Sequence, residues 1–294
     1  MKNVRLVLGS GGARGMAHIG IIEELEKEGF CIKEVIGSSM GAVVGGIYCA
    51  GYLRQFRDWL LTLDKVGVFQ LLDFTLSGEG FVKGERVFRT IEKLIGEHQI
   101  EQFKVPFTAV AVDVLNQEEV HYKTGSLFKA LRASIAIPTL FTPAYEEGRQ
   151  LVDGGVLNPL PVNLVTREPG DWVVAVNLNG NPPCPPAPTV FAETANQEKA
   201  AYLKMLSAWW EQSPAQVPPK KVAHLGLFDL LTKSLDMMQD KMADLMIHLH
   251  QPELVITIPR ETCGIFEFYR AEELIDKGRQ AFWEAYTAQQ QSAG

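Results

Sequence analysis

Two glycine-rich stretches near the start of the chain carry the residues with the clearest chemistry. In the sequence Gly-Ser-Ser-Met-Gly, Ser39 stands at the centre of a G-x-S-x-G pattern between Gly37 and Gly41. This pattern is typical of a nucleophilic serine on a sharp strand-to-helix turn, where larger flanking side chains would collide. It predicts covalent acyl transfer with Ser39 as the nucleophile. A glycine-rich helix start capped by a serine is the alternative without catalysis.

The second stretch, residues 9–15, reads Gly-Ser-Gly-Gly-Ala-Arg-Gly. Unpaired N–H groups at the start of a helix attract anions, such as a pyrophosphate or the oxyanion of an acyl-transfer intermediate. The dinucleotide fingerprint fails because Arg14 takes the place of its last glycine and no acidic residue ends the second strand. No G-K-[ST] follows either. Oxyanion binding is favoured over nucleotide binding and over a purely structural turn.

A serine nucleophile needs a base, and the histidines are poorly placed to supply it. None of the six histidines ends a predicted strand. His18 falls within a predicted helix and is interpreted as structural, and His248 and His250 end an amphipathic helix, where a cation is favourable. Asp153 ends a short apolar run just before two glycines, so a carboxylate base is the remaining candidate. A plain Asp-Gly turn is the alternative for Asp153.

The elements that must position these residues follow from hydrophobic periodicity. Apolar runs at 4–9 and 32–37 predict buried strands, and residues 16–29 have helical spacing, so the chain starts β-α-β-α as in a parallel sheet. Parallel strands end at one edge of a sheet, so the glycine loop and Ser39 should be neighbours. Residues 59–96 indicate helices broken by a loop. Further strands are predicted at 107–115, 118–125, 150–153, 171–180 and 253–259, and further helices at 126–134, 224–250 and 269–286.

Composition limits the class of protein. A chain of 294 residues with 46% hydrophobic and 21% charged residues is ordinary for a soluble globular protein. Its net charge of −7 argues against a nucleic-acid binder. The four cysteines show no metal spacing and indicate reduced thiols in a cytosolic protein. The N-terminus lacks the apolar segment of a signal peptide.

Two segments need separate interpretation. Residues 35–53 carry no charge and are long enough to cross a bilayer, but their many small residues and the lack of a second span disfavour a membrane helix. We expect instead an elbow followed by a buried helix. Residues 181–222 are rich in proline and predict an insert in a single domain of residues 1–294, acting as a lid, a linker or a partner surface.

Four motifs in order carry a family resemblance: "LGSGGARGMAHIG", "GSSMGA", "LRASIAIPTLFTP" and "VDGGVLNPLPV". By these motifs, and by "PELVITIP" and "FYRAEELIDKGRQA", the chain resembles the patatin-like phospholipases, in particular their bacterial, neuropathy-target-esterase-like branch. The resemblance covers nearly the whole chain except the proline-rich insert. It implies a three-layer α/β/α fold with a central, mostly parallel sheet and a Ser–Asp dyad without histidine.

The resemblance also implies the roles of single residues. Ser39 is the implied nucleophile and Asp153 the implied base, with Gly37 and Gly41 in the elbow. The implied oxyanion hole consists of Gly11, Gly12, Arg14, Gly15 and Met40. Ser10 is a departure, because many members of the family have glycine there.

The implied substrates are lipid or phospholipid carboxylic esters, with no metal and no cofactor. The apolar stretch at 66–81 offers surface for an acyl chain or a membrane face, unless it forms ordinary core helices. A cytoplasmic location with peripheral contact at the inner face of the membrane is expected. A regulatory or adaptor module that keeps the fold and binds a partner through the insert is the alternative. The sequence leaves the head group and the oligomeric state open.

Overall fold

The computed structural model describes residues 2–73, 82–180 and 226–292. The chain forms two units, one of Met1–Asn181 with Lys233–Gly294 and one of Pro182–Thr232, of which only residues 226–232 are described. The predicted proline-rich insert at 181–222 therefore lies outside the described residues. The sheet, every candidate site residue and the helices around the sheet, except for the helical residues 227–232, belong to the first unit.

Eight strands form one sheet within the described residues, in the order β5-β6-β3-β2-β1-β7-β8, with β4 paired to β3 beside this path. Their bounds are β1 Asn3–Leu8, β2 Cys31–Ser38, β3 Phe107–Asp113, β4 Glu118–Tyr122, β5 Ala144–Glu146, β6 Arg149–Asp153, β7 Trp172–Gly180 and β8 Leu254–Pro259. The strands β3, β2, β1, β7 and β8 are parallel to one another, whereas β4, β5 and β6 pair antiparallel. The predicted parallel core is confirmed, and β5 is a short strand that was not predicted.

Helices surround this sheet. Their bounds in the described chain are α1 Ala17–Lys27, α2 Met40–Cys49, α3 Leu53–Leu60, α4 Lys65–Leu71, α5 Glu85–Ile95, α6 Leu127–Ser134, α8 Leu227–His250 and α9 Ala271–Ser292. A 3₁₀ turn at Gly12–Met16 precedes α1, and another at Phe268–Arg270 precedes α9. The predicted last helix, 269–286, is wrong at both ends. It starts later because of that turn, and it continues to Ser292 because alanine and glutamine sustain a helix without an apolar pattern.

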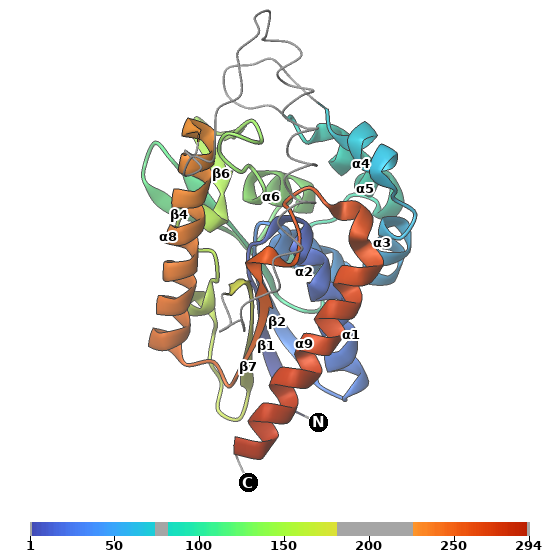
Figure 1. Ribbon diagram of the computed structural model, residues 1–294, viewed down its shortest axis with the longest axis vertical. Helices are drawn as coiled ribbons and strands as arrows, with labels where there is room; N and C mark the ends of the chain where they lie inside the picture. Colours follow the sequence, from blue (N-terminus) through green and yellow to red (C-terminus); the bar gives the residue numbers. More distant parts are fainter. Residues whose placement is uncertain (1, 74–81, 181–225, 293–294) are drawn as a thin grey trace, which may run out of the picture. The chain divides into compact units, whose positions relative to one another are not determined.

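The sheet is buried on both faces, which makes a three-layer α/β/α structure. Side chains alternate between the faces of a strand. On one face Val7, Val173 and Ala175 form a cluster with Ala243 of α8. On the other face a larger cluster joins the sheet to α1, α2 and α9. Figure 1 shows α8 on one side of the strands and α1 and α9 on the opposite side. The predicted fold class is confirmed.

The strand β3 has two different partners along one edge, and this arrangement brings distant residues together. Ser38, the last residue of β2, is in register with Val110 of β3. Asp153, the last residue of β6, is in register with the next residue, Ala111. Because β4 occupies the other edge of β3 at these positions, β2 and β6 share one edge and meet end to end. The residue after β2 therefore lies beside the end of β6.

No helix among the described residues is long and apolar enough to span a membrane. The charge-free stretch at 35–53 is divided between the end of β2, the elbow and α2. The buried helix that we expected in this stretch is present as α2, directly after a one-residue turn at Ser39.

Candidate active site

Ser39 is the single residue between β2 and α2, and its backbone is strained. Its φ of 56° and ψ of −127° lie in a region that side-chain-bearing residues rarely adopt. Such a conformation costs about 1–3 kcal/mol and persists only where the surroundings impose it. The side chain is 3% exposed. The surrounding structure therefore holds a strained, tight turn at Ser39.

The glycines that flank Ser39 are needed because other backbone comes close to them. A Cβ on Gly41 would lie 2.1 Å from the carbonyl oxygen of Leu8, at the end of β1. A Cβ on Gly37 would lie 2.5 Å from the backbone of Gly41 itself. Neither distance is compatible with a side chain. The two glycines thus allow α2 to start directly against the end of the sheet.

Asp153 is the hydrogen-bond acceptor for the Ser39 hydroxyl. The Ser39 Oγ donates to Asp153 Oδ2 at 2.5 Å, and the N–H of Gly155 donates to Oδ1 at 2.7 Å. Asp153 is 3% exposed, and this burial raises the pKa of its carboxyl group to about 7 against the lowering effect of the two hydrogen bonds. A carboxylate with a pKa near 7 can accept a proton from a nucleophile at neutral pH.

One short segment at the end of α6 holds the backbones of both residues. The N–H of Ser39 donates to Ser134 Oγ at 2.9 Å, and Ser134 Oγ donates to the carbonyl of Val110 at 2.6 Å. Two residues further on, the carbonyl of Ala136 accepts from the N–H of Asp153 at 3.0 Å. Ser134 is fully buried. The segment 134–136 therefore fixes the distance between the serine and the aspartate.

The glycine loop presents two N–H groups without a partner. The N–H groups of Ser10 and Ala13 donate to backbone carbonyls at 2.9 Å each. Between them, the N–H groups of Gly11 and Gly12 have no acceptor among the described residues. Gly12 has a φ of +56°, which favours glycine. The loop thus has two neighbouring donors available for an anion.

The loop packs directly against the other two parts of the site. A Cβ on Gly15 would lie 2.2 Å from Cγ of Met40, the residue after Ser39. A Cβ on Gly155 would lie 3.1 Å from Cβ of Ser10. Met40 begins α2, so its own N–H is not bonded within the helix. Glycine loop, elbow and aspartate loop are therefore in contact.

The side chain of Arg14 anchors the glycine loop to other segments of the chain. Its guanidinium is buried and donates to the carbonyls of Leu178 at 2.9 Å, Cys263 at 3.1 Å and Arg260 at 3.2 Å. Burial lowers the pKa of Arg14, yet an arginine with its high ordinary pKa stays charged in a protein. The side chain of Arg14 is thus held in place by hydrogen bonds to backbone carbonyls.

Asn179 accommodates the unusual serine in the glycine loop. Its Nδ2 donates to the carbonyl of Ser10 at 3.0 Å and to Ser10 Oγ at 3.3 Å. The Ser10 side chain is therefore satisfied inside the site. Sequence reasoning assigned no role to Asn179 or to Ser134. The signal for Ser134 was present, since it stands in the motif "LRASIAIPTLFTP", but a serine at a helix end has no local pattern that marks its partner.

Among the described residues, no histidine forms a hydrogen bond with Ser39 or Asp153. His18 is fully buried, and burial lowers its pKa to about 4, so the imidazole is neutral at pH 7. Its Nε2 lies 2.9 Å from the carbonyl of Gly9, which fixes the hydrogen on Nε2. The buried position of His18 supports the interpretation that this histidine has a structural role. Among the described residues no group of three or more His, Cys, Asp or Glu side chains could hold a metal ion.

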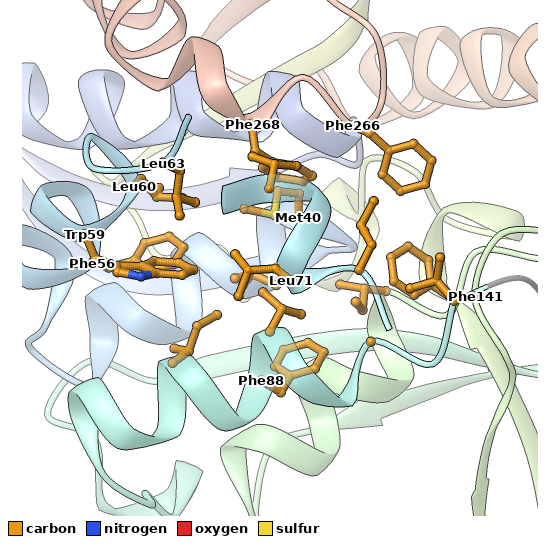
Figure 2. Close-up of a pocket in the computed structure, with 18 residues that line it drawn as sticks. Met40, Phe56, Trp59, Leu60, Leu63, Leu71, Phe88, Phe141, Phe266 and Phe268 are labelled. Carbon is orange, nitrogen blue, oxygen red and sulfur yellow. The ribbon is translucent and has the colours of Figure 1, made fainter. Parts of the chain in front are cut away.

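An apolar cavity of about 90 Å³ opens beside the elbow. Its described lining consists of apolar residues and one glycine from α2, α3, α4, α5 and the segments around residues 135–141 and 266–268. Figure 2 shows these side chains around Met40. Met40 follows Ser39, and Ile135, another lining residue, follows Ser134. The cavity therefore begins at the two residues next to the hydrogen-bonded site.

The structure thus places a serine, a buried aspartate and a glycine loop together at one end of the sheet. Comparison with known proteins identifies the family. The family model of the patatin-like phospholipases matches residues 6–166, more than half of the chain. The chain therefore belongs to the patatin-like phospholipase family.

Three related proteins and one solved structure are similar to this chain. An uncharacterised NTE family protein of Mycobacterium tuberculosis is 35% identical, over 97% of this chain and 91% of that protein. The lysophospholipase nte1 of Neurospora crassa is 31% identical over 60% of this chain but only 12% of its own length. The mouse patatin-like phospholipase domain-containing protein 6 is 29% identical over 71% of this chain and 15% of its own length. Among solved structures, VipD from Legionella pneumophila matches with a TM-score of 0.43 and 14% identity, over 97% of this chain and 67% of that chain.

Proposed function

We propose that the protein is a serine acyl hydrolase that cleaves carboxylic esters of lipids or phospholipids. The observation that carries the proposal is the 2.5 Å hydrogen bond from Ser39 Oγ to Asp153 Oδ2. A serine hydroxyl on a strained elbow, bonded to a buried carboxylate, has the geometry of an activated nucleophile. Membership in the patatin-like phospholipase family supports the same chemistry.

The reaction would proceed through an acyl-enzyme. Ser39 Oγ attacks the ester carbonyl carbon while Asp153 takes the hydroxyl proton, and the carbonyl oxygen becomes an oxyanion. The N–H groups of Gly11 and Gly12 donate to this oxyanion. Collapse of the intermediate expels the alcohol, which takes the proton from Asp153. Water then attacks the acyl-enzyme with Asp153 as base, and releases the fatty acid and free Ser39.

The segment 134–136 and Arg14 would support this reaction without touching the substrate. Ser134 accepts the N–H of Ser39, so this N–H is already engaged and the oxyanion donors would come from the glycine loop and Met40. Arg14 keeps that loop in place through its bonds to backbone carbonyls. Preorganised donors of this kind contribute about 2.7–4 kcal/mol each to transition-state stabilisation.

The apolar cavity supports a substrate with a hydrocarbon chain. Its lining offers no charged or hydrogen-bonding side chain for a sugar, a peptide or a nucleotide among the described residues, apart from the indole N–H of Trp59. Burying an acyl chain there gains about 0.8 kcal/mol per methylene. The names of two relatives, a lysophospholipase and a phospholipase domain-containing protein, agree with lipid esters as the substrate class.

The alternative of a regulatory or adaptor module depends on the proline-rich insert. Residues 181–222 lie outside the described residues, and no feature of the remaining chain favours this alternative. Lipid contact at the inner face of a membrane and a cytoplasmic location stay predictions of the same proposal.

Labelling with a fluorophosphonate probe tests the nucleophile. The unaltered protein is expected to react covalently and to hydrolyse p-nitrophenyl esters and lysophospholipids, and Ser39→Ala should lose both. The neighbouring hydroxyl offers a matched control, because Ser38 is equally buried and its Oγ has no partner among the described residues. Ser38→Ala should be labelled like the unaltered protein. Equal labelling of folded Ser39→Ala would refute the assignment.

A further inference from the structure

One end of the cavity is lined by Phe266, which directly follows a residue packed against the glycine loop. Ile265 packs against Gly12, since a Cβ on Gly12 would lie 3.0 Å from its side chain. The next residue, Phe266, lines the cavity together with Phe141, and their ring centroids are 6.3 Å apart. This pair therefore marks the end of the cavity that is nearest to the oxyanion donors.

The opposite end is closed by two aromatic side chains of α3. Figure 2 shows Phe56 and Trp59 on the side away from Phe141 and Phe266, with Met40 between the two pairs. Phe56 and Trp59 pack with ring centroids 5.7 Å apart. Phe56 is 1% exposed and belongs to the core, whereas Trp59 is only partly buried. The far end of the cavity is thus lined by one core side chain, Phe56, and by one partly exposed aromatic side chain, Trp59.

An acyl chain attached to Ser39 would run from the first pair to the second. Its carbonyl group lies at the glycine loop, and its methylenes pass Met40. The side chains that line the cavity among the described residues are apolar, apart from the indole N–H of Trp59. Every methylene inside this lining gains binding free energy, and a methylene beyond the indole gains none and must displace packed atoms.

We propose that Trp59 sets the longest acyl chain that the enzyme accepts, by closing the far end of the cavity. This inference rests on the proposed function and names its substrate class more closely: esters of acyl chains short enough to end before Trp59. Within this limit each added methylene should raise kcat/KM by about fourfold, which is the factor for one buried methylene. Beyond the limit kcat/KM should stop rising and fall.

A chain-length series tests the inference on the full-length protein. The substrates are p-nitrophenyl esters from butanoate to hexadecanoate, each used below its critical micelle concentration. The unaltered protein should show a rise and then a fall in kcat/KM. Trp59→Ala should move the maximum to longer chains, by at least two methylenes, and the milder Trp59→Leu should move it less. Alkyl fluorophosphonates of the same lengths should give the same order in their labelling rates.

Trp283 provides the matched control. It is a tryptophan of α9 that is 39% exposed and does not line the cavity. Trp283→Ala should keep the chain-length profile of the unaltered protein. An unaltered protein that hydrolyses esters with no upper chain limit would overturn the inference, as would folded Trp59 variants with an unshifted maximum. Both outcomes leave the proposed function intact, whereas absence of all hydrolysis and labelling would remove the function itself.

Discussion

The hydrogen-bonded elbow and the apolar cavity adjoin at Met40, yet different interactions hold them in shape. At the elbow, Ser39 is fixed by directional bonds from its hydroxyl to Asp153 and from its N–H to Ser134. The cavity is shaped by side-chain packing among α2, α3, α4 and α5, which has no direction. A buried hydrogen bond is either made or lost, whereas apolar packing relaxes by degrees.

This difference predicts two kinds of mutant behaviour. Changes at the elbow should alter the rate of the chemical step and its dependence on pH. Changes in the cavity, such as those at Trp59, should alter which chain is preferred while the pH dependence stays the same. Substitutions at four positions around the elbow test the first of these two expectations.

Asp153→Asn should have the largest effect. Loss of the base should lower kcat by about 10³–10⁴-fold, as for other members of catalytic units. In the unaltered protein kcat/KM should rise with pH through about 7, because burial raises the pKa of Asp153 to about 7 and only the carboxylate accepts the proton. A pH–rate profile measures this. Near-full activity of Asp153→Asn would point to another base.

The same variant has a consequence for stability. The folded pKa of Asp153, about 7, lies above its ordinary value of 3.8, so the folded state holds this proton more tightly than the unfolded state. Stability from this group is present at low pH and is lost as pH rises towards 7. Asp153→Asn keeps a neutral side chain at all pH values. Its unfolding free energy relative to the unaltered protein should therefore be higher at pH 8 than at pH 4, measured by urea denaturation.

Ser134→Ala should have the next largest effect. It leaves the N–H of Ser39 buried without an acceptor, at a cost of about 1–3 kcal/mol in stability. A small displacement of the nucleophile should lower kcat by about 10–100-fold with little change in KM. Ser126→Ala is the control on the same helix, because it removes an N-cap bond to Lys129 far from the elbow. Equal kcat values for the two variants would mean that Ser134 has no positioning role.

Arg14→Lys should have a smaller effect on rate. Lysine cannot reproduce the fork that binds the carbonyls of Leu178 and Cys263, so the glycine loop should loosen. We expect kcat/KM to fall about tenfold, less than for complete removal of an oxyanion donor. Arg279→Lys, in a partly exposed ion pair, is the control and should change kcat/KM by less than about twofold. An unchanged kcat/KM for Arg14→Lys would mean that catalysis does not depend on the hydrogen bonds from Arg14 that hold the glycine loop.

Ser39→Gly compared with Ser39→Ala should have the smallest effect, on stability alone. Both variants lack the nucleophile, but only glycine relaxes the backbone strain at a φ of 56°. The glycine variant should be more stable by about 1 kcal/mol or more, measured by thermal unfolding. At Ala42, inside α2, glycine should instead destabilise by about 0.5–1 kcal/mol. If the glycine form were less stable than the alanine form at both positions, the backbone at Ser39 would be unstrained.

Local features of this chain were predictable because the forces behind them are local. Gly37 and Gly41 meet the requirement for small residues around a tight turn. The close approach of Leu8 explains why Gly41 is needed. Buried strands and amphipathic helices follow from periodicity, which gave the parallel core and α8. The end of α9 was predicted too early, because its last residues extend the helix without an apolar pattern.

The partners across the site were not predictable from spacing. Ser39 and Asp153 are 114 residues apart, and an Asp-Gly pair by itself indicates only a turn. The family resemblance implied this pairing, and the structure brings it about by the register of β2 and β6 on one edge of β3. The bonds from Ser134 and Arg14 arise in the same way, from segments that meet only in the folded chain.

The sequence by itself determined the tight turn at Ser39, the glycine loop and the parallel sheet, because steric limits and hydrophobic periodicity act between residues close along the chain. Only the tertiary structure decided which carboxylate lies beside Ser39, why its pKa is raised, and where the cavity ends. Those properties depend on burial and on distances between residues far apart in sequence. Packing of the whole domain, including the aromatic pair at Trp59, sets them.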